Sequence, residues 1–242
     1  QTGVAQRMFA ALAVAGINIQ MITTSEIKIS VLVQRSEATA ALRAVHQGFG
    51  LHLKPSDANV WRIGQKGASD LSANDIIERL RNSNMEQLTL LDISMVGDQA
   101  RVTLSGVPDT PGLADKVFKH VAEAGVFVDM IVQSCDGFQG ETSISFTVPE
   151  EQMNKCLKVL ESMDYKFRKI SGSMDIAKLS VSGIGLRSHT SVAIAMFKSL
   201  ADSGINVLMI NTSELRVNVV VDGKQGQKGL ECLQSTFAAS LL

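Results

Sequence analysis

The sequence predicts an α+β fold in which one βαββαβ unit, a four-stranded antiparallel sheet with two helices on one face, occurs three times. Residues 1–33 align with residues 189–221 without a gap, and about half of the aligned positions are identical. Residues 110–134 match both copies more loosely. In each copy, a helical spacing of apolar residues is followed by the alternation typical of strands. We therefore expect tandem domains of the ferredoxin-like type.

These copies divide the chain into four segments. We expect repeat A at 1–51, a linker with a short helix at 52–86, repeat B at 87–172 and repeat C at 173–242. Repeat A lacks its first strand, because the residues that would form it would precede Gln1, and we expect the chain to begin inside a repeat. An extra strand before repeat B, "EQLTLLDISMV", is expected to complete the sheet of B or of C.

The elements follow the same order in every copy. In repeat B the alternating stretch 100–107 predicts a strand, and the apolar spacing that follows predicts a helix up to a left-handed cap at Gly125, matched by Gly16 and Gly204. Strands are then expected at 126–134 and 141–148, a helix from Pro149, and a last strand at "YKFRKIS".

The composition excludes several classes of partner. With 45% hydrophobic residues, 19% charged residues and a net charge of −1, the chain lacks the basic surface that nucleic acids attract. No apolar run approaches the roughly 18 residues of a membrane span. Cys135, Cys156 and Cys232 are too dispersed for a zinc or disulfide framework and predict buried thiols in a reducing compartment. We expect a cytoplasmic protein that binds neither nucleic acid nor membrane.

The chain contains no pattern of catalytic or metal-binding residues. Its four histidines are far apart, and no phosphate-binding loop or acidic cluster is present. The stretch "LSVSGIGLRSHTSV" imitates a dinucleotide-binding loop, but Ser188 stands at the third glycine position, and the repeats make this corner a feature of the fold. We predict no catalytic residue, no metal ligand and no cofactor in these residues.

One corner of repeat B has the chemistry of a ligand site. In "GVPDTPG", Gly112 lets a ligand approach the backbone N–H groups of the next helix, where a carboxylate is stabilised. Asp109 could bind the ammonium group of the same molecule, so the corner suits a free α-amino acid. The alternative is a plain helix start, with Asp109 as the cap and Pro111 in the first helical position.

Polar residues also recur at matched places in otherwise apolar strands. Asp129 and Gln133 are four apart in repeat B and are expected on one face of the sheet. Repeat C carries Asn206, Ser213 and Glu214, and repeat A carries their counterparts Asn18, Ser25 and Glu26. These residues predict facing half-sites, unless they only solvate the edge of a sheet.

The strings "GVPDTPGLADKVF", "VFVDMIVQS", "TSISFTV" and "GINVLMINTSELRVNVVV" closely resemble the paired ACT domains at the carboxyl end of aspartate kinases. The resemblance covers nearly the whole chain. It implies a regulatory region that binds lysine or threonine as a feedback inhibitor of ATP-dependent aspartate phosphorylation, the reaction that opens lysine, threonine and methionine synthesis. ATP and Mg²⁺ would belong to a kinase domain absent from this chain.

By position, the resemblance implies two pockets at the interface of repeats B and C. A threonine pocket would be lined by Asp109, Gly112, Ala114 and Gln133 of B with Asn206 and Val207 of C. A lysine pocket would be lined by Asp129 of B with Ser213 and Glu214 of C. In repeat A, Asn18, Ile19, Ser25 and Glu26 would face a "DTPG" repeat located before Gln1.

The chain departs from the family by carrying an additional repeat before the usual pair, which implies a four-ACT parent with a further ACT repeat and a kinase domain upstream. We expect a homodimer through ACT domains. Two alternatives remain open at this point. One is an ACT sensor of another amino-acid enzyme, and the other is an interaction module without a ligand.

Overall fold

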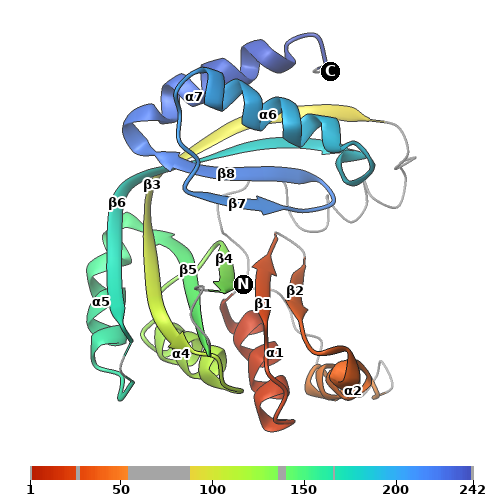
Figure 1. Ribbon diagram of the computed structural model, residues 1–242, viewed down its shortest axis with the longest axis vertical. Helices are drawn as coiled ribbons and strands as arrows, with labels where there is room; N and C mark the ends of the chain where they lie inside the picture. Colours follow the sequence, from red (N-terminus) through yellow and green to blue (C-terminus); the bar gives the residue numbers. More distant parts are fainter. Residues whose placement is uncertain (1, 26–27, 54–87, 136–139, 166, 241–242) are drawn as a thin grey trace. The chain divides into compact units, whose positions relative to one another are not determined.

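The computed structural model describes residues 2–25, 28–53, 88–135, 140–165 and 167–240 (Figure 1). Most of the expected linker, including Trp61 and the short helix, lies outside these residues, as does Glu26. The chain forms two compact units. Unit 1 comprises Gln1–Thr24, Lys28–Gly67 and Arg101–Gly172, and unit 2 comprises Ser25–Ile27, Ala68–Ala100 and Ser173–Leu242. Repeats A and B therefore share a unit, and repeat C belongs to the other.

Unit 1 is a sheet with helices packed beside one another. Its strands are neighbours in the order β2-β1-β4-β5-β3-β6, with β3 and β6 contributing the parts that belong to this unit. The helices follow the order α5, α4, α1, α2 (Figure 1). The elements are α1 (Thr2–Val14), β1 (Met21–Thr24), β2 (Ile29–Leu32), η1 (Arg35–Glu37), α2 (Ala38–Gly48), β3 (Thr89–Pro108), α4 (Leu113–Glu123), β4 (Ile131–Cys135), β5 (Glu141–Pro149), η2 (Glu150–Gln152), α5 (Met153–Glu161) and β6 (Lys169–Ile184).

Repeats A and B join edge to edge within unit 1. Strand β1 of A pairs antiparallel with β4 of B, with Thr23 opposite Val132. Helices α1 and α4 lie side by side above this seam, and the rings of Phe9 and Phe118 approach to 5.5 Å between centroids. Both rings are buried, so one hydrophobic core spans the two repeats.

Unit 2 has the strand order β3-β6-β8-β7, counting the parts of β3 and β6 that belong to it. Its elements are β3 and β6 in part, η3 (Leu186–Ser188), α6 (Thr190–Asp202), β7 (Met209–Thr212), β8 (Arg216–Asp222) and α7 (Gly223–Phe237). The helices bury one apolar face of the sheet, in a core that includes Leu179, Val219, Met196 and Leu233.

The extra strand completes the sheet of repeat C. Leu90 and Ile93 belong to the same buried core as the helices of C. The two strands approach so closely that a Cβ at Gly183 would lie 2.5 Å from the carbonyl oxygen of Thr89. From the sequence, this strand could belong to the sheet of B or to that of C. The sequence also did not show that the strand continues without a break into the first strand of B, so that both form β3.

The predicted fold class, tandem antiparallel sheets with helices, is confirmed. The three predicted left-handed caps are also confirmed, with φ of 69° at Gly16, 68° at Gly125 and 70° at Gly204. The last strand of repeat B was predicted to begin at Tyr165, but β6 begins at Lys169 and also contains the first strand of C. In this way β3 and β6 each run through the boundary between the units.

Cys156 of α5 is fully buried, and burial raises the pKa of its thiol from an ordinary value of 9.0 to about 12. Because the folded state favours the protonated thiol, the stability that this group contributes is fully present below pH 9. The free energy of unfolding then falls as the pH rises toward 12, by up to about 1.4 kcal/mol per pH unit.

We expect Cys156 to resist a maleimide at pH 8 in the folded chain and to react on unfolding. The masses of the labelled wild type and of labelled Cys156→Ala, compared in native buffer and in denaturant, show how much of Cys156 has reacted. Equal labelling of Cys156 in both conditions would contradict it. The half-buried Cys232 is a comparison thiol within the same chain.

Candidate functional site

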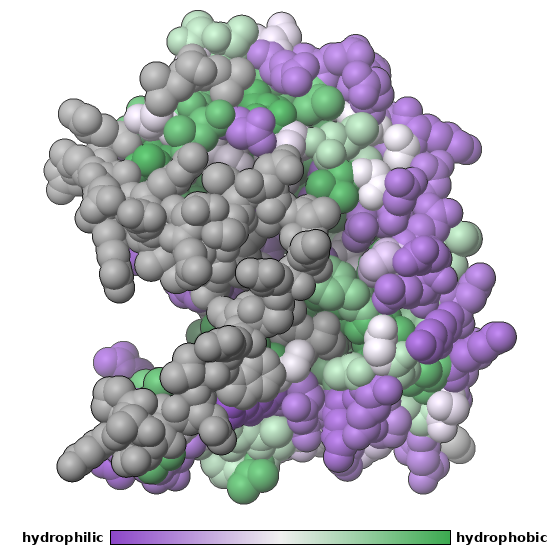
Figure 2. All heavy atoms as spheres, turned by 180° about the vertical axis from the view of Figure 1, so that it is seen from behind, coloured by the Kyte–Doolittle hydropathy of each residue, from purple (hydrophilic) through white to green (hydrophobic). Residues whose placement is uncertain are grey.

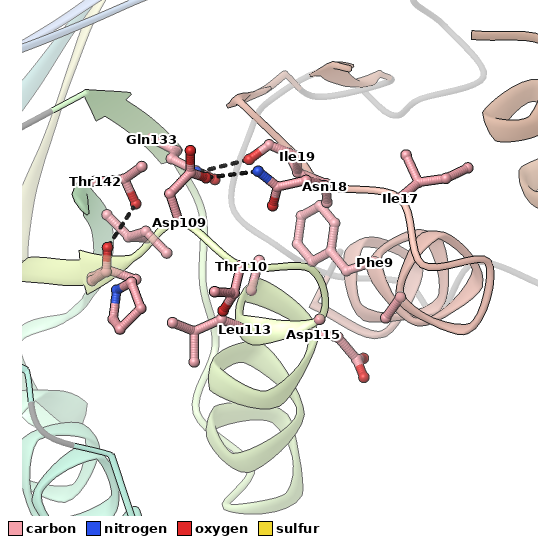
Figure 3. A pocket seen from close by; sticks show the side chains of 16 residues that line it. Phe9, Ile17, Asn18, Ile19, Asp109, Thr110, Leu113, Asp115, Gln133 and Thr142 are labelled. Atoms are coloured by element: carbon pink, nitrogen blue, oxygen red, sulfur yellow. Dashed lines mark hydrogen bonds between the residues drawn. The ribbon is translucent and has the colours of Figure 1, made fainter. Parts of the chain in front are cut away.

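A pocket lies in unit 1 where the end of β3, the start of α4 and strands β4 and β5 of repeat B meet repeat A (Figure 3). The space between the lining residues, including the open solvent at its mouth, amounts to about 340 Å³. Repeat A contributes Phe9, Ala13, Ile17, Asn18 and Ile19. Repeat B contributes Val107, Pro108, Asp109, Thr110, Gly112, Leu113, Ala114, Asp115, Gln133, Thr142 and Ile144.

Asp109 is the exposed carboxylate at one side of this pocket. The side-chain amide of Asn18 donates a 2.8 Å hydrogen bond to its Oδ1, across the seam between the repeats (Figure 3). The backbone N–H of Asp109 donates to the carbonyl oxygen of Gly140 at 2.9 Å, which fixes the loop that carries the carboxylate. The carboxylate of Asp109 is thus held at the mouth, where it can also accept a hydrogen bond from a ligand.

Gln133 is the polar side chain at the floor of the pocket, and only 5% of it is exposed. Its amide nitrogen donates a 3.0 Å hydrogen bond to the backbone oxygen of Ile19 in repeat A (Figure 3). Its amide oxygen, Oε1, has no hydrogen-bond partner among the described residues. A buried acceptor left without a partner is costly, so this oxygen favours a ligand that can donate a hydrogen bond.

The start of α4 provides backbone donors at the same place. Gly112 adopts the left-handed conformation with φ of 85° and precedes the first helical residue, Leu113. A Cβ at this position would meet the Cβ of Ala13 at an ordinary contact distance of 3.4 Å, so the positive φ is the reason for glycine here. The first N–H groups of a helix have no partner within it and attract anions.

This geometry corrects the alternative interpretation of the "GVPDTPG" corner. Helix α4 begins at Leu113, so Pro111 is not in the first helical position, and the residue that caps the helix is Gly112. No side chain donates or accepts a capping hydrogen bond there, and Asp109 is bonded to Asn18 instead. The corner is therefore not a plain aspartate cap.

The charged residues that line the pocket are both acidic. Asp115 accepts a 3.1 Å hydrogen bond from the side-chain amide of Gln6, and Asp109 accepts from Asn18. The carboxylate of Asp109 at the mouth favours a cationic group there, while the helix start favours an anionic one. A zwitterion presents both groups within one small molecule.

The structure brings together six of the predicted site residues and leaves the others apart. Those that line the pocket are Asp109, Gly112, Ala114, Gln133, Asn18 and Ile19. Those not among its lining residues are Asp129, Ser25, Asn206, Val207, Ser213 and Glu214. Glu26 lies outside the described residues.

The partner of the "DTPG" corner differs from the one that the sequence implied. Asn206 and Val207 of repeat C were expected opposite Asp109, and Asn18 was expected to face a repeat located before Gln1. In the structure Asn18 and Ile19 of repeat A take this place, and the two residues of C belong to unit 2. The expectation was wrong because the family pattern gives the type of each repeat and not which copies pair.

The residues expected to form a lysine site have local structural roles. The hydroxyl of Ser213 accepts hydrogen bonds from the backbone N–H of Leu215 at 3.3 Å and of Arg216 at 3.0 Å, which stabilises the turn between β7 and β8. The backbone N–H of Asp129 donates to Thr147 at 3.1 Å, and its carbonyl oxygen accepts from the hydroxyl of Thr24 at 3.4 Å. These contacts fix the turn between β7 and β8 in unit 2 and the seam of repeats A and B in unit 1.

Sequence reasoning missed several residues of the pocket. Thr142, which is buried, donates a 3.5 Å hydrogen bond to the carbonyl oxygen of Val107, and Phe9 and Ile17 form the apolar side in repeat A. The alternation of 141–148 places Thr142 on one face of β5 with Ile144, and this was the available signal. Nothing in the sequence showed that this face meets α1.

In the described part of the chain, no group of three or more acidic, histidine or cysteine side chains could hold a metal ion. None of its helices is long and apolar enough to cross a membrane. On the side drawn in Figure 2, hydrophilic residues cover broad areas, and hydrophobic residues are interspersed among them.

Three copies of one α+β fold, two of which share a pocket, define a class of tandem-repeat domains. The family model described as "ACT domain" matches residues 1–49, 102–163 and 179–237, one match for each repeat. The chain belongs to the ACT domain family.

Its relatives are aspartate kinases. The chain is 40% identical over 156 residues to an aspartate kinase of Stutzerimonas stutzeri, covering 64% of this chain and 38% of that protein. It is 35% identical over 157 residues to an aspartokinase of Helicobacter pylori, covering 65% and 38%. The chain thus spans well under half the length of these relatives.

Solved structures of aspartate kinases are also similar to this chain. The aspartate kinase from Synechocystis has a TM-score of 0.78 at 31% identity, covering 98% of this chain and 37% of that one. The regulatory subunit of aspartate kinase from Thermus flavus has a TM-score of 0.58 at 34% identity, covering 62% of this chain and 99% of that subunit. The resemblance to the regulatory region of aspartate kinases is confirmed, and it supports an allosteric regulatory role.

Proposed function

We propose that this chain is part of the regulatory region of an aspartate kinase, and that the pocket of repeats A and B binds free threonine or lysine as a feedback inhibitor. The observation that carries the proposal is the buried Oε1 of Gln133, which has no hydrogen-bond donor among the described residues and lies in a pocket with the carboxylate of Asp109 at its mouth. The similarity to the Thermus flavus regulatory subunit supports it.

The groups of an α-amino acid match those of the pocket. The ammonium group would bind the carboxylate of Asp109, and the carboxylate group would bind the backbone N–H groups at the start of α4. A hydroxyl or ammonium group on the side chain would donate to Oε1 of Gln133. Threonine offers the hydroxyl group, and lysine offers the second ammonium group.

Binding at this seam would change how repeats A and B are paired. Asn18 and Ile19 reach across the seam to Asp109 and Gln133, so a ligand that bonds these two residues also acts on the contacts between the repeats. A coupling of roughly 1 to 3 kcal/mol is enough for feedback control of a distant reaction. The reaction would be phosphorylation of aspartate, with ATP and Mg²⁺ held by an upstream kinase domain, in the cytoplasm. A further upstream ACT repeat and homodimer formation also belong to this proposal.

Isothermal titration calorimetry of this chain with threonine and with lysine tests the binding step. We expect saturable heat and a rise in melting temperature with at least one of them, since a ligand that binds the folded state stabilises it. D-Threonine, which cannot place all three groups together, is the control and is expected to bind more weakly. No heat and no stabilisation with either amino acid up to millimolar concentrations would refute the proposal and favour an interaction module without a ligand.

An assay of the whole enzyme separates the aspartate kinase from an ACT sensor of another amino-acid enzyme. In the parent protein we expect aspartate-dependent ATP consumption that falls when threonine or lysine is added. Amino-acid binding by this chain without aspartate kinase activity in the parent would favour the other sensor.

A further inference from the structure

Two residues between α5 and β6 contact the elements that carry the "GVPDTPG" corner, although neither of them is among the residues that line the pocket. Tyr165 and Arg168 follow α5, and β6 begins directly after Arg168, at Lys169. The corner itself joins the end of β3 to the start of α4 and carries Asp109. We refer to Tyr165 and Arg168 as the brace of this corner.

Arg168 contacts the strand that leads into the corner and the segment that fixes its carboxylate. Gly106 of β3 is buried, with φ of 66°, and a Cβ there would overlap the Cβ of Arg168 and lie 3.1 Å from its backbone nitrogen. The guanidinium group of Arg168 forms an ion pair with Glu141, the first residue of β5. The preceding carbonyl oxygen, of Gly140, accepts the 2.9 Å hydrogen bond from the N–H of Asp109.

Tyr165 contacts the first turn of α4. The ammonium group of Lys116 donates a 2.5 Å hydrogen bond to the hydroxyl of Tyr165 and lies 5.1 Å from the centre of its ring. The backbone N–H of Lys116 donates to the carbonyl oxygen of Gly112 at 3.1 Å, so Lys116 belongs to the turn that starts the helix. The ring of Phe167 stacks on that of Tyr165, with 6.4 Å between centroids. The brace is therefore connected to the helix start as well as to β3 and β5.

A corner that is held in place before binding lowers the cost of binding. An amino acid has to meet the carboxylate of Asp109 and the N–H groups at the start of α4 in one arrangement, and contacts that fix both parts leave less conformational entropy to be lost. Each contact of the brace is weak alone, because the side chains of Arg168 and Glu141 are 44% and 37% exposed. Their effect comes from acting on the same corner from three elements.

We propose that Tyr165 and Arg168 are positioning residues of the amino-acid pocket, which hold the corner in the arrangement that binds the ligand and do not contact the ligand themselves. This inference rests on the proposed function. Without the brace the binding arrangement is less populated, and the apparent dissociation constant rises in the same proportion. The fold of unit 1 does not depend on either residue, because Tyr165 is only partly buried and Arg168 is exposed.

Calorimetry with threonine and with lysine measures the effect on binding. Arg168→Ala and Tyr165→Ala are each expected to raise the dissociation constant about two- to fivefold, and the double variant about tenfold, with unchanged circular dichroism. Arg168→Glu is expected to weaken binding as well, and adding Glu141→Arg is expected to restore it, because the reversed pair has the same attraction. Lys228→Ala, which removes a 2.7 Å hydrogen bond from an exposed cation to Ser203 in unit 2, is the control and should leave the affinity unchanged.

Amide hydrogen exchange followed by NMR tests the brace without a ligand. The N–H of Asp109 in Arg168→Ala, and that of Lys116 in Tyr165→Ala, are expected to exchange about threefold faster than in the wild type, because the corner opens more often. The N–H of Thr147, which is hydrogen-bonded outside the corner, is the internal control and should keep its rate.

Wild-type affinity in both alanine variants and in their double variant would overturn the brace. So would unchanged exchange at both corner amides, a Glu141→Arg substitution that fails to restore binding to Arg168→Glu, or an equal loss of affinity in Lys228→Ala. A lower melting temperature with unchanged affinity would show a role in stability alone and would also overturn it. A wild type that binds neither amino acid would refute the proposed function, whereas the exchange rates would still decide whether the brace holds the corner.

Discussion

Replacing Phe118 by alanine is expected to lower the free energy of unfolding of unit 1 by about 3 to 5 kcal/mol. The side chain is fully buried, and its ring contacts Phe9 of repeat A at 5.5 Å and Phe146 of β5 at 5.4 Å between centroids. The substitution removes apolar contacts on both sides of the seam and leaves a cavity that the sheet cannot fill. Urea denaturation followed by circular dichroism measures the change.

Phe197→Ala is the matched control, because Phe197 is the counterpart of Phe118 in repeat C but is only partly buried. At a protein concentration too low for association, it is expected to cost clearly less. Two transitions are to be fitted separately if the units unfold independently. A loss below about 1 kcal/mol for Phe118→Ala would contradict a shared core of repeats A and B.

Gln133→Ala is expected to weaken amino-acid binding at least about tenfold, because it removes both the acceptor offered to the ligand and the bond to Ile19. The side chain is buried, so we also expect a stability loss of about 1 to 3 kcal/mol. Calorimetry well below the melting temperature separates the two effects, provided that the variant keeps the circular dichroism of the wild type.

Gln152→Ala is the control for this variant. Its amide oxygen accepts a 2.8 Å hydrogen bond from the backbone N–H of Phe127, so the same truncation removes one side-chain bond outside the pocket. It should leave amino-acid affinity unchanged. Equal affinity for the wild type and Gln133→Ala, with the fold intact, would show that Gln133 has only a structural role.

The repeat made much of the fold accessible to sequence reasoning. Because A and C share about half of their aligned residues, one pattern of strands and helices could be derived from three copies. The caps at Gly16, Gly125 and Gly204 followed from the same comparison, since a left-handed φ favours glycine at matching helix ends. Strand ends were less accessible, since β6 begins at Lys169, four residues after the predicted start.

The candidate site was predicted in its parts but not in its assembly. Asp109, Gly112 and Gln133 came from local chemistry and from the family resemblance, and all of them line the pocket. The interpretation of Pro111 as the first helical residue failed because Gly112 has a left-handed φ, and α4 begins two residues after Pro111, at Leu113. Thr142 and Phe9 were missed because their role depends on which repeat is opposite.

The sequence by itself determined that the chain is a set of ACT repeats and that "GVPDTPG" is special to repeat B. These properties depend on local spacing and on comparison between copies. The tertiary structure alone decided that A is the partner of B and that the extra strand belongs to C. Strand edges and buried seams join residues far apart in the chain, as Asn18 and Asp109 show, and repeats A and C are identical at about half of their aligned positions. Because the two copies are similar in sequence, local spacing does not distinguish which of them pairs with B.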